Sequence, residues 1–337
     1  MEIIAQLLLL LLLTRLFGMI ATRFGQPATV GEITAGIGIA AYVAGFGVSL
    51  PVLGPILSGI ATSDGLQMVA NGAIFFLVLT AGIEMRPDDV KQHSGASFMV
   101  AIGGAAVPLV AGFWLAWTLL PDTGARQAQA LLVGVVMSIT SIPATIKVLS
   151  ELNLIKSLSG QTIISAAIFD DIIGLFLLAV LTAVIETGHI PDAVDFALLL
   201  LKIGIFFGVV VGLGVHVYPR VSRRLRALET ASLEFGTLMA VGLGYGLLAE
   251  ELGMHWLLGA FAAGLFFEPS RVGGRAYTEI RLIATGITAG FFGPIFFASI
   301  GLRVALQAVA AIPGIVALLI MTAFFGKLLG AGVAARW

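Results

Sequence analysis

The stretch 160–186, GQTIISAAIFDDIIGLFLLAVLTAVIE, is a long apolar run with two adjacent carboxylates, Asp170 and Asp171, near its middle. A helix rises about 1.5 Å per residue and the hydrocarbon core of a bilayer is about 30 Å thick, so both side chains would lie about 15 Å deep. One Asp at that depth costs about 2.5–3.5 kcal/mol, and two neighbouring carboxylates also repel each other, which favours a proton on at least one of them. Such a costly pair indicates a functional site. The alternative is a pair that only makes hydrogen bonds between helices.

The composition is typical of a membrane protein. Of the 337 residues, 59% are hydrophobic and only 11% are charged, which indicates a chain that crosses the lipid bilayer many times. The formal net charge of −1 argues against a nucleic-acid partner. The chain has no cysteine, and its four histidines include no pair at metal-ligand spacing, so we expect no resident cofactor and no transition-metal site.

Eleven apolar runs of membrane length follow one another, at about 3–20, 28–47, 67–85, 97–119, 128–150, 160–185, 195–217, 231–249, 254–268, 279–301 and 311–334. When Lys and Arg residues near the ends of the runs are assigned to the nearest connection, the odd-numbered connections hold thirteen of them, whereas the even-numbered ones hold two, Arg126 and Arg303. The positive-inside rule therefore predicts that the odd connections lie in the cytoplasm and that the N-terminus lies outside.

Two short motifs recur with the same offset of seven runs. The pattern G-x-x-x-A-G lies at 31–36 in the second run and at 259–264 in the ninth. The triplet I-F-F followed by a glycine lies at 74–82 in the third run and at 295–301 in the tenth. Because seven is odd, the second copy would lie upside down relative to the first. This inverted repeat is the plan of many secondary transporters.

The fifth run contains a proline preceded by three hydroxyl residues, in the stretch SITSIP at 138–143. Pro143 has no N–H and obstructs the helical bond to the carbonyl four residues earlier, so the helix is expected to break or kink there. Freed carbonyls and the hydroxyls of Thr140 and Ser141 would line a cavity, because exposed backbone polar groups cannot face lipid. We expect oxygen ligands for a small hard cation beside Asp171 or Asp170. The alternative is a proline kink patched by hydroxyl groups.

Lys327 lies inside the last apolar run, in the stretch FFGKLLG at 324–330. A buried ammonium group needs an acidic partner or must lose its proton, and Asp170 is the natural candidate. The alternative is that this long side chain extends to the cytoplasmic interface. Other charges at or near the ends of apolar runs are expected to be interfacial rather than ligands: Glu32, Glu84, Glu234 and Lys202.

Taken together, these residues resemble the bacterial cation/proton antiporter superfamily, in particular the NapA-like sodium/proton antiporters and their Kef-type potassium relatives. The resemblance covers nearly the whole chain and depends on an ordered set of motifs: Gln26-Pro27-x-x-x-Gly31-Glu32, Ala81-Gly82-Ile83-Glu84, Thr140-Ser141, Phe169-Asp170-Asp171, Leu258-Gly259-Ala260-Phe261, Gly293-Pro294-Ile295-Phe296-Phe297 and Gly326-Lys327. It implies a homodimer in a bacterial inner membrane, with a mobile core domain that moves like an elevator. It also implies that Asp171 is the main cation ligand, that Asp170 pairs with Lys327, and that Thr140 and Ser141 belong to the broken helix of the site.

On this resemblance the chain divides into four segments. We expect the first spans on the scaffold and dimerisation side at 1–65, and a first-repeat core with the broken helix and the Asp pair at 66–190. A linker helix and a basic loop follow at 191–230, and an incomplete second inverted repeat at 231–337. Family members have about two more spans after the Gly-Lys helix, including a second broken helix. The expected fold is thus an all-α membrane protein of about eleven helices that lacks those last two.

The sequence therefore predicts a secondary active transporter, not an enzyme, that exchanges Na⁺ or Li⁺ for protons at one shared site on Asp170 and Asp171. Competition of cation and proton for that site, with a rule against moving it empty, is sufficient for coupling. The alternatives are a K⁺/H⁺ antiporter of the same fold, a sodium-coupled organic-anion symporter and an ion channel. The expected partners are the lipid bilayer and a second copy of the chain, and we expect no soluble regulatory domain in this chain.

Overall fold

The computed structural model describes residues 2–46, 53–85, 94–187, 193–221 and 231–335, and all the regular structure in these residues is helical. Within the helices, the side chains of Pro143 and Asp171 lie outside the described part. The all-α fold that the composition predicts is confirmed for these residues.

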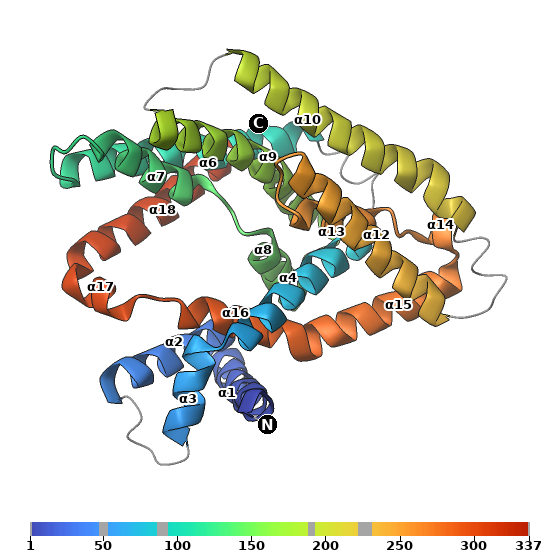
Figure 1. Cartoon of the computed structure of the whole chain (residues 1–337), viewed down its shortest axis with the longest axis horizontal. Helices are drawn as coiled ribbons and strands as arrows, with labels where there is room; N and C mark the ends of the chain where they lie inside the picture. The colour runs from blue at the N-terminus through green and yellow to red at the C-terminus, as the bar shows by residue number, and fades with distance from the viewer. Residues whose placement is uncertain (1, 47–52, 86–93, 188–192, 222–230, 336–337) are drawn as a thin grey trace.

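The helices follow one another in a simple order, which the colours of Figure 1 trace from the N- to the C-terminus. The first half of the chain forms α1 (Glu2–Arg23), α2 (Ala28–Phe46), α3 (Leu53–Thr62), α4 (Asp64–Glu84), α6 (Ser94–Leu119), α7 (Arg126–Ser138), α8 (Ile142–Glu151) and α9 (Leu158–Thr187). The second half forms α10 (Ala193–Gly212), the π-helix η1 (Leu213–Val217), α12 (Ala231–Glu251), α13 (Leu257–Leu265), α14 (Pro269–Val272), α15 (Gly274–Ile287), the π-helix η2 (Thr288–Phe292), α16 (Gly293–Leu302), α17 (Leu306–Ala311) and α18 (Pro313–Ala334).

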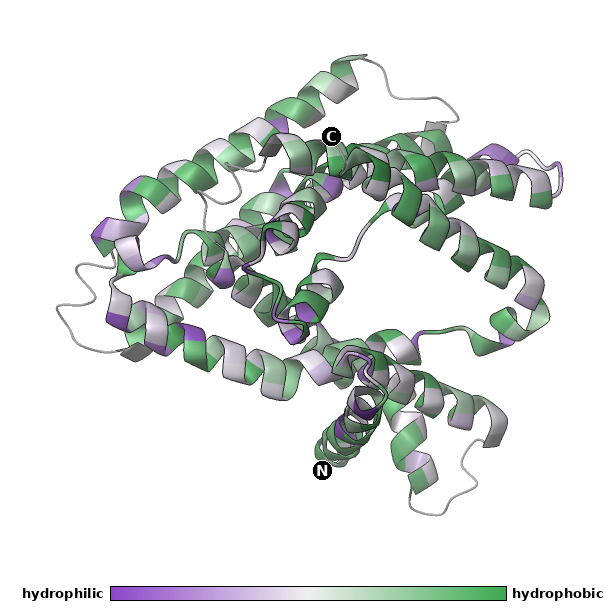
Figure 2. Ribbon diagram, turned by 180° about the vertical axis from the view of Figure 1, so that it is seen from behind, coloured by the Kyte–Doolittle hydropathy of each residue, from purple (hydrophilic) through white to green (hydrophobic). Residues whose placement is uncertain are grey.

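Seven helical segments of the described chain are long and apolar enough to cross a membrane. Hydrophobic residues predominate along most of the helices (Figure 2). On α1, for example, the exposed residues Leu8, Leu12, Leu16 and Met19 recur about one turn apart. An apolar stripe of this kind is stable against lipid, whereas in water it would be an aggregation-prone patch. The chain is therefore a multi-pass membrane protein, and the count of eleven spans stays a prediction.

The helices follow the expected apolar runs, with a few local differences. The ninth run was expected to be helical over about 254–268, but its helix α13 has only nine residues. Gly253, with a φ of +80°, lies in the turn that ends α12, and Pro269 starts the separate short helix α14. The second difference is α3, a ten-residue helix that precedes the third run.

The helices pack as two bundles, which lie on different sides of α8 in Figure 1. The α9 bundle consists of α6, α7, α9 and α18, which pack mainly on one another. The α4 bundle consists of α1–α4, α12, α13, α15 and α16. Helix α8 contacts α2 and α4 on one side and α9 on the other, so it links the two bundles.

These bundles do not coincide with the segments expected along the sequence. Helix α4 falls within the expected first-repeat core at 66–190, but it packs against α13 and α16 in the other bundle. Helix α18 falls within the expected second repeat, but it packs against α6 beside the Asp170 helix. Each bundle therefore combines helices from both halves of the chain.

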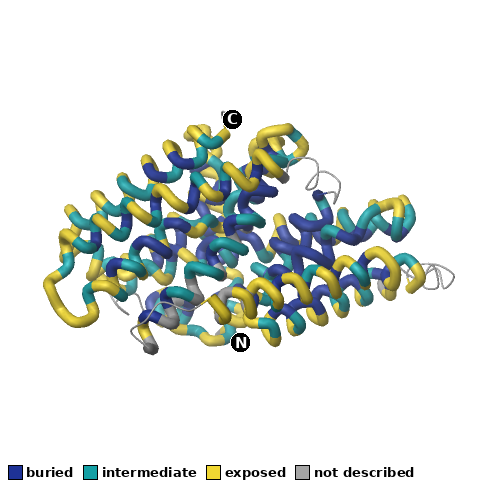
Figure 3. Tube along the Cα trace, turned by 90° about the horizontal axis from the view of Figure 1, so that it is seen from above, coloured by how far each residue is buried: buried dark blue, intermediate teal, exposed yellow. Residues whose placement is uncertain are grey.

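The larger hydrophobic core lies inside the α4 bundle. Leu79 of α4, Leu238 of α12 and Ile280 of α15 are all completely buried there, and Phe267 after α13 is 1% exposed. Ile164, near the start of α9, joins the same core and ties the α9 bundle to it. Figure 3 shows buried residues toward the interior of the molecule and exposed residues along its outer faces.

A pair of glycines brings α2 and α16 into backbone contact. A Cβ atom added to Gly36 would lie 2.1 Å from the carbonyl oxygen of Ala298, and one added to Gly301 would lie 2.2 Å from the carbonyl oxygen of Ile33. Only glycine fits at both positions. Small residues of this kind let membrane helices approach closely, where burial of apolar surface from water provides no driving force.

A second glycine pair makes the same contact between α4 and α13. A Cβ atom on Gly264 would lie 2.2 Å from the carbonyl oxygen of Leu79, and one on Gly82 would lie 2.2 Å from that of Phe261. The two crossings correspond residue by residue. From α2 to α13 the shift is 228 positions, which pairs Gly36 with Gly264 and Ile33 with Phe261. From α4 to α16 the shift is 219 positions, which pairs Gly82 with Gly301 and Leu79 with Ala298. This equivalence is the structural counterpart of the repeat read from the sequence.

The crossing predicts a sharp difference between two glycines of the same helix. Gly82→Ala should destabilise the protein by about 1–3 kcal/mol, because backbone would have to move to admit the methyl group. Gly72→Ala on α4 should be neutral or stabilising by up to about 1 kcal/mol, because nothing lies within 4 Å of its Cβ position. Thermal unfolding of the two purified variants checks this. Equal melting temperatures would contradict the close crossing.

Candidate functional site

The fifth apolar run is a broken helix, as its sequence predicts. Helix α7 ends at Ser138, the backbone at Ile139 (φ −73°, ψ 139°) and at Ser141 (φ −79°, ψ 106°) is extended, and α8 starts at Ile142. Pro143 lies in the first turn of α8, where a proline is tolerated because that turn's N–H groups have no helical partner. The break therefore lies just before the proline rather than at it.

The break lies against the middle of α9. A Cβ atom on Gly174 would lie 3.5 Å from the side chain of Ile139, an ordinary contact distance, so the extended segment packs directly on α9 there. One turn earlier on α9, Asp170 is 4% exposed, and its Oδ2 accepts a 2.7 Å hydrogen bond from the backbone N–H of Thr140. A carboxylate thus satisfies a backbone donor that the break leaves without a helical partner.

Lys327 completes this constellation from α18. Its Nζ donates hydrogen bonds to the backbone carbonyl of Ser138 and, at 2.6 Å, to Thr140 Oγ1, and it lies 3.5 Å from Asp170 Oδ2. The side chain is 29% exposed, and its ammonium group points to the break rather than to the end of α18. Three oxygens from the break and α9 therefore surround one positive charge.

The arrangement is chemically a small-cation site with an ammonium group in it. A carboxylate, a hydroxyl and a freed backbone carbonyl are the ligand types with which transporters bind Na⁺ in unwound helices. Here Lys327 Nζ makes contact with all three. A metal ion that used the same oxygens would have to displace the ammonium group first.

The other predicted site residues are placed less completely. Ser141 Oγ accepts a 3.5 Å hydrogen bond from the backbone N–H of Ala144 and so caps α8. Asp171 follows Asp170 in α9, and neither its side chain nor that of Pro143 is among the described ones. The structure thus brings together Asp170, Thr140 and Lys327, and the transport roles of all these residues stay predictions.

Two features escaped the sequence analysis. The carbonyl of Ser138 was not named as a ligand, although the last carbonyls of any interrupted helix lack a helical partner. Glu32 was expected to be interfacial, but it is only 2% exposed and faces Lys147 and Glu151 of α8. In the sequence, the spacing of Lys147 and Glu151, four residues apart, indicated an ion pair on the expected helix, and the structure shows that pair at 3.1 Å. That spacing gave no indication that Glu32 lies beside it.

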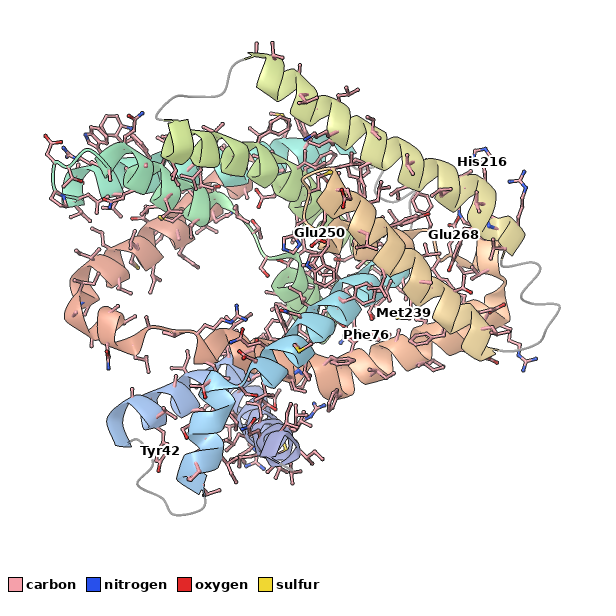
Figure 4. All side chains as sticks on the ribbon, viewed as in Figure 1. Tyr42, Phe76, His216, Met239, Glu250 and Glu268 are labelled. Carbon is pink, nitrogen blue, oxygen red and sulfur yellow. The ribbon has the colours of Figure 1, made fainter. Side chains whose placement is uncertain are left out.

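A cavity of about 450 Å³ lies apart from the Asp170 constellation, between the end of α4, the start of α9 and the start of α15. Its charged lining includes Glu84 and Arg281, which lie 3.8 Å apart, and Lys156. Glu268, labelled in Figure 4, also lines it and pairs with Arg271. The positive and negative charges are mixed, so the cavity has no evident preference for one ion.

Comparison with known proteins adds an independent observation. A family model described as "Sodium/hydrogen exchanger, transmembrane" matches residues 8–337. Similar sequences include the probable Na⁺/H⁺ antiporter GerT of Bacillus cereus, which is 28% identical over 98% of this chain and 82% of its own length. They also include the Na⁺/H⁺-K⁺ antiporter GerN of the same organism, at 27% over 99% of this chain and 80% of its own length.

A solved structure has a similar fold. The sodium proton antiporter MjNhaP1 from Methanocaldococcus jannaschii, at pH 8, aligns with 99% of this chain and 79% of its own, with a TM-score of 0.62. The sequence identity is 18%, so this likeness concerns the fold alone.

Proposed function

Because the chain belongs to the sodium/hydrogen exchanger family, we propose that it exchanges Na⁺ or Li⁺ for protons across a membrane at one shared site centred on Asp170 and Asp171. The observation that carries this proposal is the three-oxygen cradle of Asp170, Thr140 and the Ser138 carbonyl, in which the Lys327 ammonium group lies. Such a cradle suits one small monovalent cation.

Exchange follows from competition within the cradle. When Na⁺ enters, its charge replaces that of the ammonium group on Asp170, and Lys327 loses the carboxylate that stabilises its charged form. The amine then releases its proton as it leaves. When Na⁺ departs, the amine takes up a proton and returns. We propose Asp171 as a further cation ligand that is protonated while the cation is absent.

The packing supports an elevator-type movement. Asp170, Lys327 and Ser138 all belong to helices of the α9 bundle, so the cradle can move with that bundle as a unit. Helix α8 is the link to the α4 bundle, which would serve as the scaffold. We propose that the α4 bundle also forms the contact in a homodimer. We also propose that the odd-numbered connections face the cytoplasm of a bacterial cell.

The second candidate is a K⁺/H⁺ antiporter of the same fold. GerN, whose name includes K⁺, is 27% identical to this chain. An organic-anion symporter is less well supported, because the basic group in the Asp170 constellation is engaged by three oxygens and is not open to a carboxylate substrate. A channel would not need the lysine that closes the cradle.

The function is tested by proton flux in proteoliposomes that contain the full chain. After a pH gradient is imposed, Na⁺, Li⁺, K⁺ and choline are added in turn, and the internal pH is followed with a fluorescent dye. We expect Na⁺ and Li⁺ to move protons and choline to have no effect. A response to K⁺ alone would select the second candidate, and no response to any alkali cation would refute the antiporter proposal.

Thr140 offers a finer test of the cradle. Thr140→Val removes the hydroxyl but keeps the backbone N–H that binds Asp170, so the fold of the break should survive. Loss of a hydrogen bond to a charged group is worth about 1.5 kcal/mol, so the apparent affinity for the cation should fall about tenfold, more than the maximal rate does. Ser141→Ala is measured in parallel, and its loss of the cap should lower stability. Unchanged affinity in Thr140→Val would mean that the hydroxyl only supports the bent backbone.

A further inference from the structure

A second buried carboxylate lies outside the Asp170 constellation, at the contact between α2 and α8. Glu32, about one turn into α2, is 2% exposed, and among the described residues its Oε2 has no hydrogen-bond partner. Glu151, at the end of α8, has a second buried oxygen without a partner, its Oε2. Buried polar atoms are nearly always paired, so two orphaned carboxylate oxygens on helices that pack together require an explanation.

The positive charges around Glu32 are already engaged. Lys147 Nζ lies 3.1 Å from Glu151 Oε1, which also accepts a 3.1 Å hydrogen bond from Thr29 Oγ1. Arg15 of α1 donates to the backbone carbonyls of Ala289, at 3.0 Å, and Gly290. The other helices that pack on α2, namely α3, α16 and α17, have no charged residue. No described cation therefore makes an ion pair with Glu32.

A carboxylate in this position is unfavourable when it is ionised. An isolated buried charge costs several kcal/mol unless it is paired, whereas the neutral acid costs much less. The neutral acid has one O–H, which needs an acceptor, and Glu151 Oε2 is a buried acceptor without a partner. One added proton would therefore serve both orphaned oxygens.

We propose that Glu32 holds a proton that it donates in a hydrogen bond to Glu151 Oε2, and that the contact between α2 and α8 is a second proton-binding site, separate from the one on Asp170. The site joins the two bundles, because Glu32 and Thr29 belong to the α4 bundle and Glu151 belongs to the linking helix α8. The donor set holds no third carboxylate, and no cluster of three or more metal-binding side chains was found in the described chain. A proton therefore suits the site better than a metal ion does.

The position of the site gives the proton a role, which rests on the proposed alternating access. When α8 moves away from α2, Glu32 becomes exposed to water and holds its proton less tightly. By linkage, the proton then stabilises the state in which α2 and α8 are in contact. Acid on the side of the membrane where α2 begins should keep Glu32 protonated, favour the state in which α2 and α8 are in contact, and slow exchange. A higher pH should remove the proton and speed up exchange.

The direct test is infrared spectroscopy of the purified full chain over a pH series, which reads the C=O stretch of protonated carboxyl groups. Glu32→Gln should remove one such band at neutral pH. Glu279→Gln is the matched control, because Glu279 pairs with the exposed Arg275 on the surface of α15, and this change should leave the band intact. Identical spectra for wild type and Glu32→Gln would overturn the proposal.

A second variant tests the site without altering Glu32. Glu151→Gln removes the neighbouring negative charge and frees Lys147 to pair with Glu32, so the band should disappear at a pH lower by about one unit or more. An unchanged midpoint would overturn the pairing. The spectra are repeated with Na⁺ in place of choline. A Na⁺-dependent loss of the Glu32 band at constant pH that persists in Asp170→Asn would mean that the Glu32 site itself takes the alkali cation, which also overturns the proton assignment.

Exchange rates test the linkage to transport. In wild type, exchange should rise with pH as Glu32 releases its proton, whereas Glu32→Gln, which is permanently neutral, should keep the slow acidic rate throughout that pH range. An unchanged pH profile would overturn the linkage. The spectra remain decisive even if no alkali cation drives flux, so failure of this proposal and failure of the antiporter proposal are distinguishable.

Discussion

Asp170→Asn is expected to lower cation-driven proton flux at least about 100-fold while the protein still folds and inserts into the membrane. The Asn side-chain oxygen can still accept the hydrogen bond from the Thr140 N–H, so the break keeps its support. The neutral amide, however, cannot balance a cation or the ammonium group of Lys327. Removing one member of a buried charge pair costs about 3–5 kcal/mol, and about 3 kcal/mol already corresponds to more than 100-fold in affinity.

The matched control is Asp122→Asn, which makes the same chemical change on an exposed carboxylate. Asp122 is 91% exposed and lies 3.5 Å from Arg126, where water screens its charge. Flux in proteoliposomes, with retention volume and melting temperature measured on the same preparations, separates loss of transport from loss of folding. Wild-type flux in well-folded Asp170→Asn would remove Asp170 from the ion site.

Lys327→Gln is expected to leave an exchange that no longer depends on membrane voltage. If Lys327 releases a proton each time a cation enters, that proton adds to the one from Asp171, and the two protons carry more charge than the single cation. Without the amine, one proton is exchanged for one cation and the cycle is electrically neutral. The protein should also lose about 3 kcal/mol of stability, because Asp170, whose side chain is 5% exposed, is left buried without its charge partner.

Two further variants sharpen this test. Lys327→Arg keeps a positive charge that does not lose its proton, so we expect a stable protein with slow exchange. Lys202→Gln removes a lysine from α10, outside the site, and should preserve both rate and voltage dependence. The measurement is exchange rate against imposed membrane potential. Equal voltage dependence and equal melting temperature in wild type and Lys327→Gln would show that the lysine takes no part in the cycle.

Properties that depend on neighbouring residues were predictable from the sequence alone. The apolar runs indicate a membrane protein, because no soluble fold could cover so much apolar surface. Pro143 predicts a helix break, because a proline has no backbone N–H to donate to a helical hydrogen bond. The recurring glycine motifs predict an inverted repeat. Each of these inferences needs only local chemistry and position along the chain, so each was open to sequence reasoning.

Properties that depend on which segments meet were decided only by the tertiary structure. Lys327 and Ser138 are far apart in the chain, and nothing local indicates that the ammonium group reaches that carbonyl. Glu32 looks interfacial by position, but α8 packs over it and leaves it buried without a partner. The physical reason is that the free energy of a charged group depends on the charges and dipoles within a few ångströms of it, and in a packed bundle most of these come from distant parts of the sequence.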